Sequence, residues 1–264
     1  MRMATRAVLP VLLMLCAGVA LAQPAKKEFE PYSGQAGKDV VWVPTPFVLV
    51  EKMLDVAKVT PQDFVMDLGS GDGRNIIAAA KRGARARGVE YNPDMVALSR
   101  RTAAKEGVAE KAEFVQGDMY VADISQATVM ALFLLPENMD KLVSKFLALK
   151  PGSRIVANQF PATGWEPDEQ GRAEGDCMSW CNWLLYIVPV QAGGSWRLGQ
   201  GELKLEQKFQ KLSGTLTVNG AAQEIENGRL RGDEISFTAG GKSYTGKVGA
   251  DTMVGAGWNA TRLK

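Results

Sequence analysis

The feature that most constrains this chain is a cluster of three glycines behind a short apolar run. Residues 65–76 read VMDLGSGDGRNI, which places Gly69, Gly71 and Gly73 at alternate positions. Fixing a glycine costs more backbone entropy than fixing any other residue, so three within five positions need a reason. A buried strand, a glycine-rich turn and a helix, in that order, open the nucleotide-binding half of a Rossmann-like sheet.

The spacing of the glycines separates the ligands that such a turn can hold. A dinucleotide turn requires a glycine where this chain has Arg74, and the lysine and hydroxyl pair of a triphosphate loop is absent. What remains is Asp67 followed by the three glycines. Glu90 and Asp118 come at the ends of the next two predicted strands. Glu90 can accept hydrogen bonds from both ribose hydroxyls, and Asp118 can accept one from an adenine amino group. Together the carboxylates predict a pocket for adenosine without phosphates.

Strand and helix patterns alternate from residue 47 to residue 160. Such alternation indicates an α/β fold with a doubly wound, mostly parallel sheet and helices on both faces. Prolines frame the first helix, for which Thr45 is a candidate cap. The helices are expected over 47–58, 74–82, 93–106 and 137–149, and the strands over 64–68, 86–90, 113–116, 128–135 and 154–160.

The pattern changes near residue 190. From residue 196 to the end, short alternating segments are separated by turn pairs such as Asn219-Gly220 and Gly240-Gly241. This spacing predicts a C-terminal antiparallel β-meander domain, for which we expect five to seven strands. The expected organisation is a signal peptide over 1–22, a linker over 23–40, an α/β domain over 41–193 and a β domain over 194–264.

The first 22 residues have the composition of a secretory signal peptide. Arg2 and Arg6 precede an apolar run over residues 8–20, and small residues then favour cleavage after Ala22. A membrane anchor is the alternative, but this run is short of the roughly 20 residues that a span needs. We therefore expect a periplasmic or secreted protein without a stable membrane span after cleavage.

Composition excludes several kinds of site. The chain has no histidine, which rules out a Ser-His-Asp site, a Cys-His site and a histidine zinc site, and no metal is predicted. The net charge of +2 implies no nucleic-acid partner for the whole chain. Cys177 and Cys181 can form a disulfide if the chain turns between them, or remain two buried thiols. We interpret Trp180 and Trp196 as packing between the two domains.

The quoted glycine motif, with GVEYNP and VQGDM further on, resembles the cofactor-binding motifs of class I S-adenosylmethionine-dependent methyltransferases. With WVPTP and LLPENMDKLVSKFLALKPGSRIVANQFP, the stretch over about residues 41–165 is similar to the seven-strand lysine methyltransferases that modify the ATP-synthase c-subunit. The resemblance implies a seven-strand sheet, S-adenosylmethionine as cofactor and a protein lysine as acceptor. It implies cofactor contacts from Thr45, Asp67, Gly69, Ser70, Gly71, Gly73, Glu90, Asn92, Asp118 and Met119.

The same resemblance places the acceptor at the end of the fourth strand, beside Leu134, Leu135, Pro136 and Glu137. Glu137 could orient the amine there. The chain departs from relatives because it has no Asn-Pro-Pro-Tyr element, which argues against amino groups of nucleic-acid bases. Two other functions stay open: a small-molecule methyltransferase, and a non-catalytic exported binding protein that keeps the fold. Export itself conflicts with a cofactor that is made in the cytoplasm.

Overall fold

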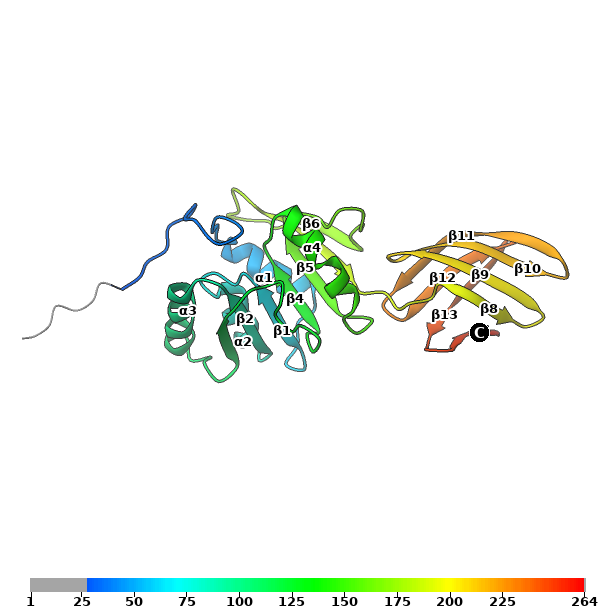
Figure 1. Cartoon of the computed structure of the whole chain (residues 1–264), viewed down its shortest axis with the longest axis horizontal. Helices are drawn as coiled ribbons and strands as arrows, with labels where there is room; N and C mark the ends of the chain where they lie inside the picture. The colour runs from blue at the N-terminus through cyan, green and yellow to red at the C-terminus, as the bar shows by residue number, and fades with distance from the viewer. Residues whose placement is uncertain (1–27, 264) are drawn as a thin grey trace, which may run out of the picture.

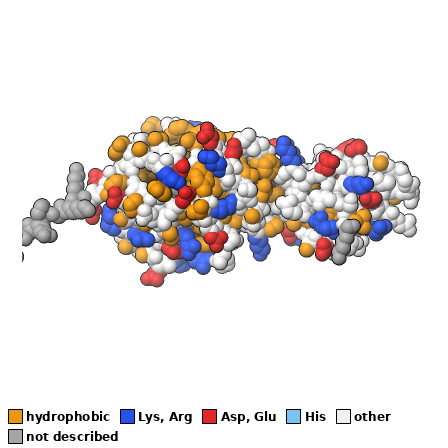
Figure 2. Space-filling view, viewed as in Figure 1, with side chains coloured by type: hydrophobic (Ala, Val, Ile, Leu, Met, Phe, Trp, Pro, Cys, Tyr) orange, Lys and Arg blue, Asp and Glu red, His pale blue; other side chains and the backbone are white. Residues whose placement is uncertain are grey.

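The computed structural model describes residues 28–263, so the expected signal peptide and its cleavage site lie outside the described residues. Figure 1 shows an α/β part and a β barrel arranged one after the other along the molecule. On the face drawn in Figure 2, apolar side chains gather over the α/β part, whereas the barrel shows few of them. None of the helices within residues 28–263 is long and apolar enough to cross a membrane.

The α/β part is a seven-stranded sheet in the order β3-β2-β1-β4-β5-β7-β6, as expected from the alternating pattern. The first five strands pair in parallel, whereas β7 runs antiparallel to β5 and β6 antiparallel to β7. The strands are β1 (Phe64–Leu68), β2 (Arg85–Glu90), β3 (Ala112–Gln116), β4 (Val129–Leu132), β5 (Arg154–Asn158), β6 (Glu169–Arg172) and β7 (Asn182–Ile187), and the helices are α1 (Phe47–Val56), α2 (Arg74–Lys81), α3 (Pro93–Lys105) and α4 (Pro136–Leu147).

Both faces of this sheet are covered, which explains why β1 is apolar at almost every position. All five residues of β1 are buried. Val65 packs into the core that includes α1 and α2, and its neighbour Met66 packs into the opposite core with α4. The strand order reverses between β1 and β4, and ligands of such sheets bind at the carboxyl ends of the strands at that point.

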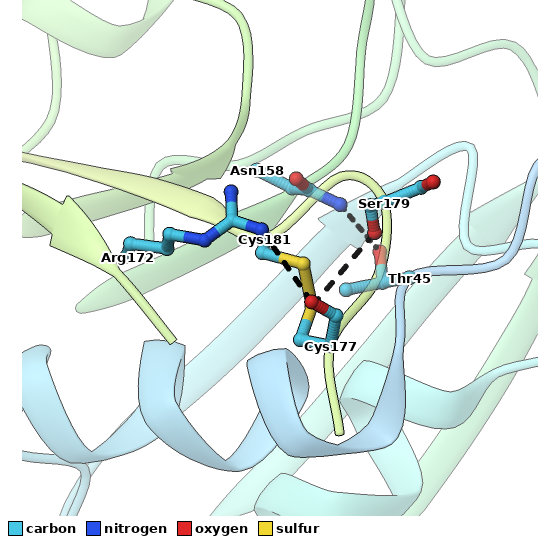
Figure 3. The surroundings of a disulfide bond; sticks show 6 residues. All are labelled: Thr45, Asn158, Arg172, Cys177, Ser179 and Cys181. Carbon is cyan, nitrogen blue, oxygen red and sulfur yellow. Dashed lines mark hydrogen bonds between the residues drawn. A yellow bond between two sulfur atoms is a disulfide. The ribbon is translucent and has the colours of Figure 1, made fainter. Parts of the chain in front are cut away.

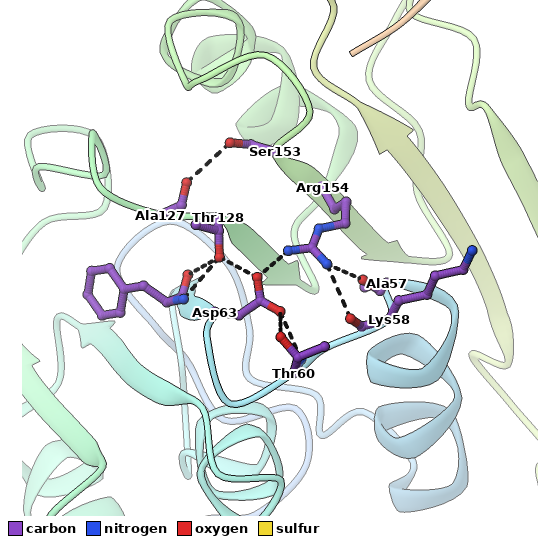
Figure 4. A network of polar contacts seen from close by, with 9 residues as sticks. Ala57, Lys58, Thr60, Asp63, Ala127, Thr128, Ser153 and Arg154 are labelled. Atoms are coloured by element: carbon purple, nitrogen blue, oxygen red, sulfur yellow. Dashed lines mark hydrogen bonds and ion pairs between the residues drawn. The ribbon is translucent and has the colours of Figure 1, made fainter. Parts of the chain in front are cut away.

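The opposite, amino-terminal edge of the sheet is tied by Asp63 (Figure 4). Its Oδ1 accepts from Thr128 Oγ1 at 2.7 Å and pairs with Arg154, and its Oδ2 accepts from the Thr60 backbone N–H at 2.8 Å. Burial alone would raise the pKa of Asp63, but the hydrogen bonds and Arg154 outweigh it and the pKa is lowered. This network joins the loop before β1 to the starts of β4 and β5.

The C-terminal strands are antiparallel, as expected, but they form a closed barrel of eight strands rather than a meander of five to seven. Closure follows from pairing of the last strand with the first, which leaves no open edge. The strands are β8 (Gly194–Leu198), β9 (Gly201–Lys208), β10 (Lys211–Val218), β11 (Ala221–Arg231), β12 (Glu234–Ala239), β13 (Lys242–Val248), β14 (Thr252–Gly255) and β15 (Trp258–Arg262).

Contacts between the barrel and the sheet involve other residues than those expected. Trp196 is fully buried in the core of the barrel, not between the domains. Instead, the ring of Phe209 stacks on Trp165 with centroids 5.3 Å apart. Arg229 on β11 donates to the fully buried carboxylate of Asp168 at 2.8 Å. This aromatic pair and this buried ion pair dock the barrel on the sheet, together with more exposed contacts such as the pair of Arg231 with Glu169.

Candidate cofactor and acceptor site

A cavity of about 380 Å³ lies at the carboxyl ends of the strands, on both sides of the point where the strand order reverses. Its walls come from the glycine turn after β1, from the ends of β2, β3 and β4, and from residues 35–45. The last segment includes part of the expected linker. We call residues 35–43 the strap, because two backbone hydrogen bonds, from Gly34 to Trp42 and from Trp42 to Gln35, close it into a loop over the cavity.

The three glycines share an unusual backbone conformation, and two of them also allow a close contact. All have a positive φ, at 75° for Gly69, 55° for Gly71 and 81° for Gly73, a conformation that other residues rarely adopt. A Cβ on Gly71 would lie 2.5 Å from the indole nitrogen of Trp42, so this glycine lets the strap close. A Cβ on Gly73 would lie 2.6 Å from the ring of Phe114. Gly73 therefore lets α2 approach the sheet, and it does not line the cavity.

Glu90 holds the glycine turn in place. Its Oε2 accepts from the Gly71 backbone N–H at 2.9 Å, and its Oε1 accepts from the Asn92 backbone N–H at 2.9 Å. Asn92 in turn caps α3 by accepting from Asp94 N–H at 2.9 Å. Each carboxylate oxygen has a second lone pair. Glu90 thus lines the cavity, and its remaining lone pairs can accept further hydrogen bonds at the position expected for the ribose hydroxyls.

Asp67 is a buried carboxylate at the end of β1. Asn75 Nδ2 donates to it at 3.0 Å, and no Lys or Arg within residues 28–263 pairs with it. Burial raises the pKa of Asp67 well above its ordinary value, and the negative charges of Glu90 and Asp72 raise it further. A cationic group in the cavity would offset the free-energy cost of burying the charged form of this carboxylate.

Among the described residues, two buried polar atoms at this end of the cavity lack a hydrogen-bond partner, Ser70 Oγ and Asn75 Oδ1. Buried polar groups are normally paired, so unpaired ones beside a cavity point to a polar ligand. These atoms, and the Asp67 carboxylate that has no cationic partner among the described residues, fit the polar groups of S-adenosylmethionine.

Asp118 has a partner that the sequence did not reveal. Lys38 of the strap places its Nζ 2.6 Å from Asp118 Oδ2 and 5.0 Å from the ring centre of Tyr91. Tyr120 N–H donates to Oδ1 at 2.8 Å. The hydrogen bond from Lys38 lowers the pKa of Asp118. The strap thus reaches the place where an adenine amino group was expected.

The structure brings the remaining residues predicted to contact the cofactor together around one cavity. Thr45, Gly69, Asn92 and Met119 line the same cavity as the three carboxylates. Thr45 does not cap α1, which begins after Pro46 without a side-chain cap. Its hydroxyl instead accepts from the buried Asn158 amide at 3.4 Å (Figure 3).

Two of the four residues expected at the acceptor position, Leu134 and Leu135, line the cavity. Pro136 and Glu137 begin α4 and are not among the described residues that line the cavity, and Glu137 is exposed. The wall there is made by Phe133, Phe160 and Trp180. Trp180 is 41% exposed, so its interpretation as packing between domains is wrong.

Cys177 and Cys181 form a disulfide, which resolves the choice left open by their spacing (Figure 3). Their Cα atoms lie 5.9 Å apart, because the chain turns between them. The loop that they close carries Trp180. No pattern along the chain could have indicated that this loop reaches the cavity.

Comparison with known proteins identifies the fold and the site. A family model described as the ANTKMT methyltransferase domain matches residues 67–169. The protein-lysine N-methyltransferase of Saccharolobus islandicus is 41% identical over 151 residues, which cover 56% of this chain and 94% of that protein. The chain belongs to this methyltransferase family. It is an S-adenosylmethionine-dependent methyltransferase of class I, as the resemblance of its motifs implied.

Two further relatives bear on the site. The mouse lysine N-methyltransferase of the ATP-synthase c-subunit is 37% identical over 137 residues, 52% of this chain and 53% of that protein, so the chain spans about half the length of this relative. A crystal structure of an RNA methyltransferase from Salinibacter ruber with S-adenosyl-L-homocysteine is 40% identical with a TM-score of 0.53, covering 56% of this chain and 95% of that chain. The methyltransferase cofactor is therefore S-adenosylmethionine.

Proposed function

We propose that this methyltransferase modifies the side-chain amine of lysine in a protein acceptor. The observation that carries the proposal is the continuity of the cavity. Its inner end is polar and built around Asp67 and Glu90, and its outer end is aromatic and reaches the surface at the exposed Trp180. A long aliphatic side chain that ends in an amine can enter from such a mouth while its backbone stays outside. The lysine methyltransferases among its relatives support this reading.

The residues of the inner end would hold the cofactor. Asp67 would pair with its amino group, Glu90 with the ribose hydroxyls and Asp118 with the adenine amino group. When bound, S-adenosylmethionine supplies an electrophilic methyl group on a sulfonium, a good leaving group that needs alignment more than acid or base assistance. The chain contributes that alignment through the glycine turn, which Glu90 fixes by its hydrogen bonds to Gly71 and Asn92.

The acceptor amine must be neutral before it can attack. The chain has no histidine to act as a base. Trp180 keeps the outer end of the cavity in contact with solvent, so the proton of the incoming ammonium can leave to water at the mouth. The protein then has to orient the amine, and it has to exclude water only from the inner end of the cavity.

Methyl-labelled S-adenosylmethionine tests the proposal. The purified enzyme should label proteins of a lysine-rich extract, and the label should disappear when the lysines have first been blocked by acetylation, which removes the nucleophilic amine. A nuclease-treated extract is the matched control, because the relative from Salinibacter ruber is described as an RNA methyltransferase. Label that survives lysine blocking but is lost after nuclease treatment would overturn the proposal in favour of RNA. Label confined to small molecules would do so in favour of a metabolite.

We also propose that the enzyme is exported. The basic start, the apolar run and the small residues before Gln23 support this, as does the Cys177–Cys181 disulfide, since disulfides persist in oxidising compartments. N-terminal sequencing of protein from fractionated cells tests it. A start within a few residues of Gln23 in the periplasmic or secreted fraction is expected. An intact Met1 in the cytoplasmic fraction would contradict export.

A further inference from the structure

Three aromatic rings meet at the outer end of the cavity. The ring centres of Phe133 and Phe160 are 6.2 Å apart, those of Phe133 and Trp180 are 6.0 Å apart, and those of Phe160 and Trp180 are 5.7 Å apart. We call these three residues the aromatic trio. All three line the cavity that also contains the glycine turn. Phe133 follows β4 and Phe160 follows β5, so the sheet supplies two of the rings.

The third ring comes from the disulfide loop, residues 177–181. Cys181 is fully buried and Cys177 is nearly so, whereas Met178 between them is 95% exposed. The loop therefore projects from two anchored ends. Its base is also held by the Ala173 N–H, which donates to the Cys181 carbonyl at 2.8 Å.

Trp180 has a backbone conformation that needs such anchoring. Its φ is 58°, in the left-handed region that large side chains seldom occupy. A residue in this region costs about 1–3 kcal/mol and persists only where its surroundings enforce it. The disulfide to the adjacent Cys181 is the strongest local constraint on this loop. Without it, the loop has more conformations available in which the indole does not face Phe133 and Phe160.

The chemistry of the trio suits a cationic alkylamine. Aromatic faces attract ammonium groups, and methylated ammonium groups are bound by such cages through cation–π interactions. The two cations among the described residues that line the cavity are already paired, Arg74 with Asp72 at 2.5 Å and Lys38 with Asp118 at 2.6 Å. Methylation converts a neutral amine to an ammonium ion. Rings that favour the positive charge therefore bind the transition state and product better than the neutral substrate.

From these observations we infer that the disulfide loop forms one wall of the acceptor site, holding Trp180 so that the aromatic trio binds the alkylammonium group of the acceptor. Acceptor binding then depends on the Cys177–Cys181 disulfide, and cofactor binding does not. The inference rests on the proposed lysine acceptor and adds to it a positioning role for a loop outside the cofactor motifs.

Binding of small probes to the full-length protein, saturated with S-adenosyl-L-homocysteine, tests the inference by calorimetry. The first probe is Nα-acetyl-Nε-trimethyllysine methylamide, and the second is its neutral isostere with carbon in place of the charged nitrogen. We expect the charged probe to bind about fivefold more tightly or better, as a partly desolvated cation–π contact predicts. Trp180→Ala should weaken the charged probe about tenfold, and Trp180→Phe should restore part of the loss. Met178→Ala in the same loop is the matched control and should leave the affinity unchanged.

The double variant Cys177→Ser/Cys181→Ser tests the role of the disulfide. We expect it to weaken the charged probe as Trp180→Ala does, while its affinity for S-adenosyl-L-homocysteine stays within about twofold of wild type. Dithiothreitol should have the same effect on wild type and none on the double variant. In that reduction the disulfide gains two electrons and two protons to give two thiols, and dithiothreitol is oxidised to its cyclic disulfide.

The outcomes separate this inference from the proposed function. Equal affinity for the two probes, or an unchanged affinity in Trp180→Ala, overturns the inference even if lysine is methylated. An unchanged affinity in the double cysteine variant overturns the role of the disulfide. Probe discrimination that depends on Trp180 supports the aromatic trio as an alkylammonium site, even if the labelled acceptor proves to be an amine other than protein lysine.

Discussion

The ammonium of Lys38 lies 2.6 Å from the carboxylate of Asp118, so the strap is fastened to the end of β3 directly over the cofactor cavity. Lys38 also faces the ring of Tyr91. Both members of the pair are about one-third exposed, and exposed ion pairs of this kind are worth roughly 0–1 kcal/mol. The contact is therefore strong enough to bias the strap toward closure and weak enough to open.

Lys38→Met should release the strap without removing a wall of the cavity. We expect S-adenosyl-L-homocysteine to associate and dissociate faster, with an equilibrium affinity changed by no more than about fivefold, the equivalent of about 1 kcal/mol. Stopped-flow measurement of tryptophan fluorescence, to which Trp42 and Trp180 of the cavity wall contribute, follows both rates. Lys52→Met on α1, remote from the cavity lining, is the control. An unchanged dissociation rate would show that Lys38 does not control access.

Glu90→Gln should weaken S-adenosyl-L-homocysteine binding by roughly 1.5–3 kcal/mol, the value of hydrogen bonds to a charged group. Calorimetry with the natural ligand and with its 2′,3′-dideoxy analogue separates the two tasks of Glu90. If Glu90 binds the ribose, the substitution should weaken the natural ligand and change the analogue much less. If it only holds Gly71 and Asn92, both ligands should weaken equally.

The inner half of the site could be predicted from the sequence because its signals are local. Gly69, Gly71 and Gly73 need a backbone conformation that few other residues adopt, and strand ends that carry Glu90 and Asp118 meet at one edge of a parallel sheet. These constraints act within a few residues of each motif, and the expected α/β fold and cofactor were both confirmed.

The contact of the strap with Asp118 and the outer half of the site could not be predicted, because their residues meet only through tertiary structure. Lys38 and Asp118 are 80 positions apart, and a lone lysine in a polar segment resembles a solvated charge. Phe133 continues the apolar run of β4, so nothing marks it as a cavity residue. Trp180 depends on a disulfide whose formation requires a turn that its sequence does not specify. Closure of the barrel likewise depends on pairing between its first and last strands.

Asp67 makes the cofactor-free protein sensitive to pH. Because burial raises its folded-state pKa, the folded protein holds the proton more tightly than the unfolded chain. The contribution of protonated Asp67 to folding stability is therefore complete at pH values below its ordinary pKa of 3.8. The stability of the folded protein then falls as the pH rises from 3.8 toward the folded-state pKa. Asp67→Asn cannot ionise and should reduce this loss.

Urea denaturation of wild type and Asp67→Asn at about pH 5 and about pH 8 measures the effect. We expect the variant to lose less stability than wild type over this range. It should also bind S-adenosyl-L-homocysteine more weakly, because a neutral amide cannot pair with the ligand ammonium. Parallel pH dependence of the two proteins would rule out Asp67 as the source. Tighter ligand binding by the variant would contradict its proposed role.

Two ion pairs on β11 offer a matched comparison at the junction between barrel and sheet. Arg229 pairs with the fully buried Asp168, and Arg231 pairs with Glu169, whose side chain is 48% exposed. Arg229→Met leaves a buried carboxylate without its cation and should cost about 1–3 kcal/mol of the free energy of unfolding. Arg231→Met should cost less than about 1 kcal/mol. Chemical denaturation measures both, and equal effects would mean that burial of Asp168 does not matter.

Truncation after Val190 tests whether the barrel contributes to the cofactor site. None of the described barrel residues lines the cavity, so we expect the affinity for S-adenosyl-L-homocysteine to stay within about tenfold, or about 1.4 kcal/mol. Stability should fall, because the cut exposes Trp165, which packs against Phe209, and leaves Asp168 without Arg229. Calorimetry and thermal denaturation of the truncated chain measure the two effects.

The variant Trp165→Gln/Asp168→Asn, made in the truncated chain, is the companion to this experiment. It replaces the newly exposed indole and the unpaired carboxylate, and should recover part of the lost stability without changing ligand affinity. Such recovery would assign the cost of truncation to the docking surface. If the truncated chain instead stays folded but no longer binds S-adenosyl-L-homocysteine, the barrel must shape the cavity through the sheet, because β7 leads directly from the Trp180 loop toward the barrel.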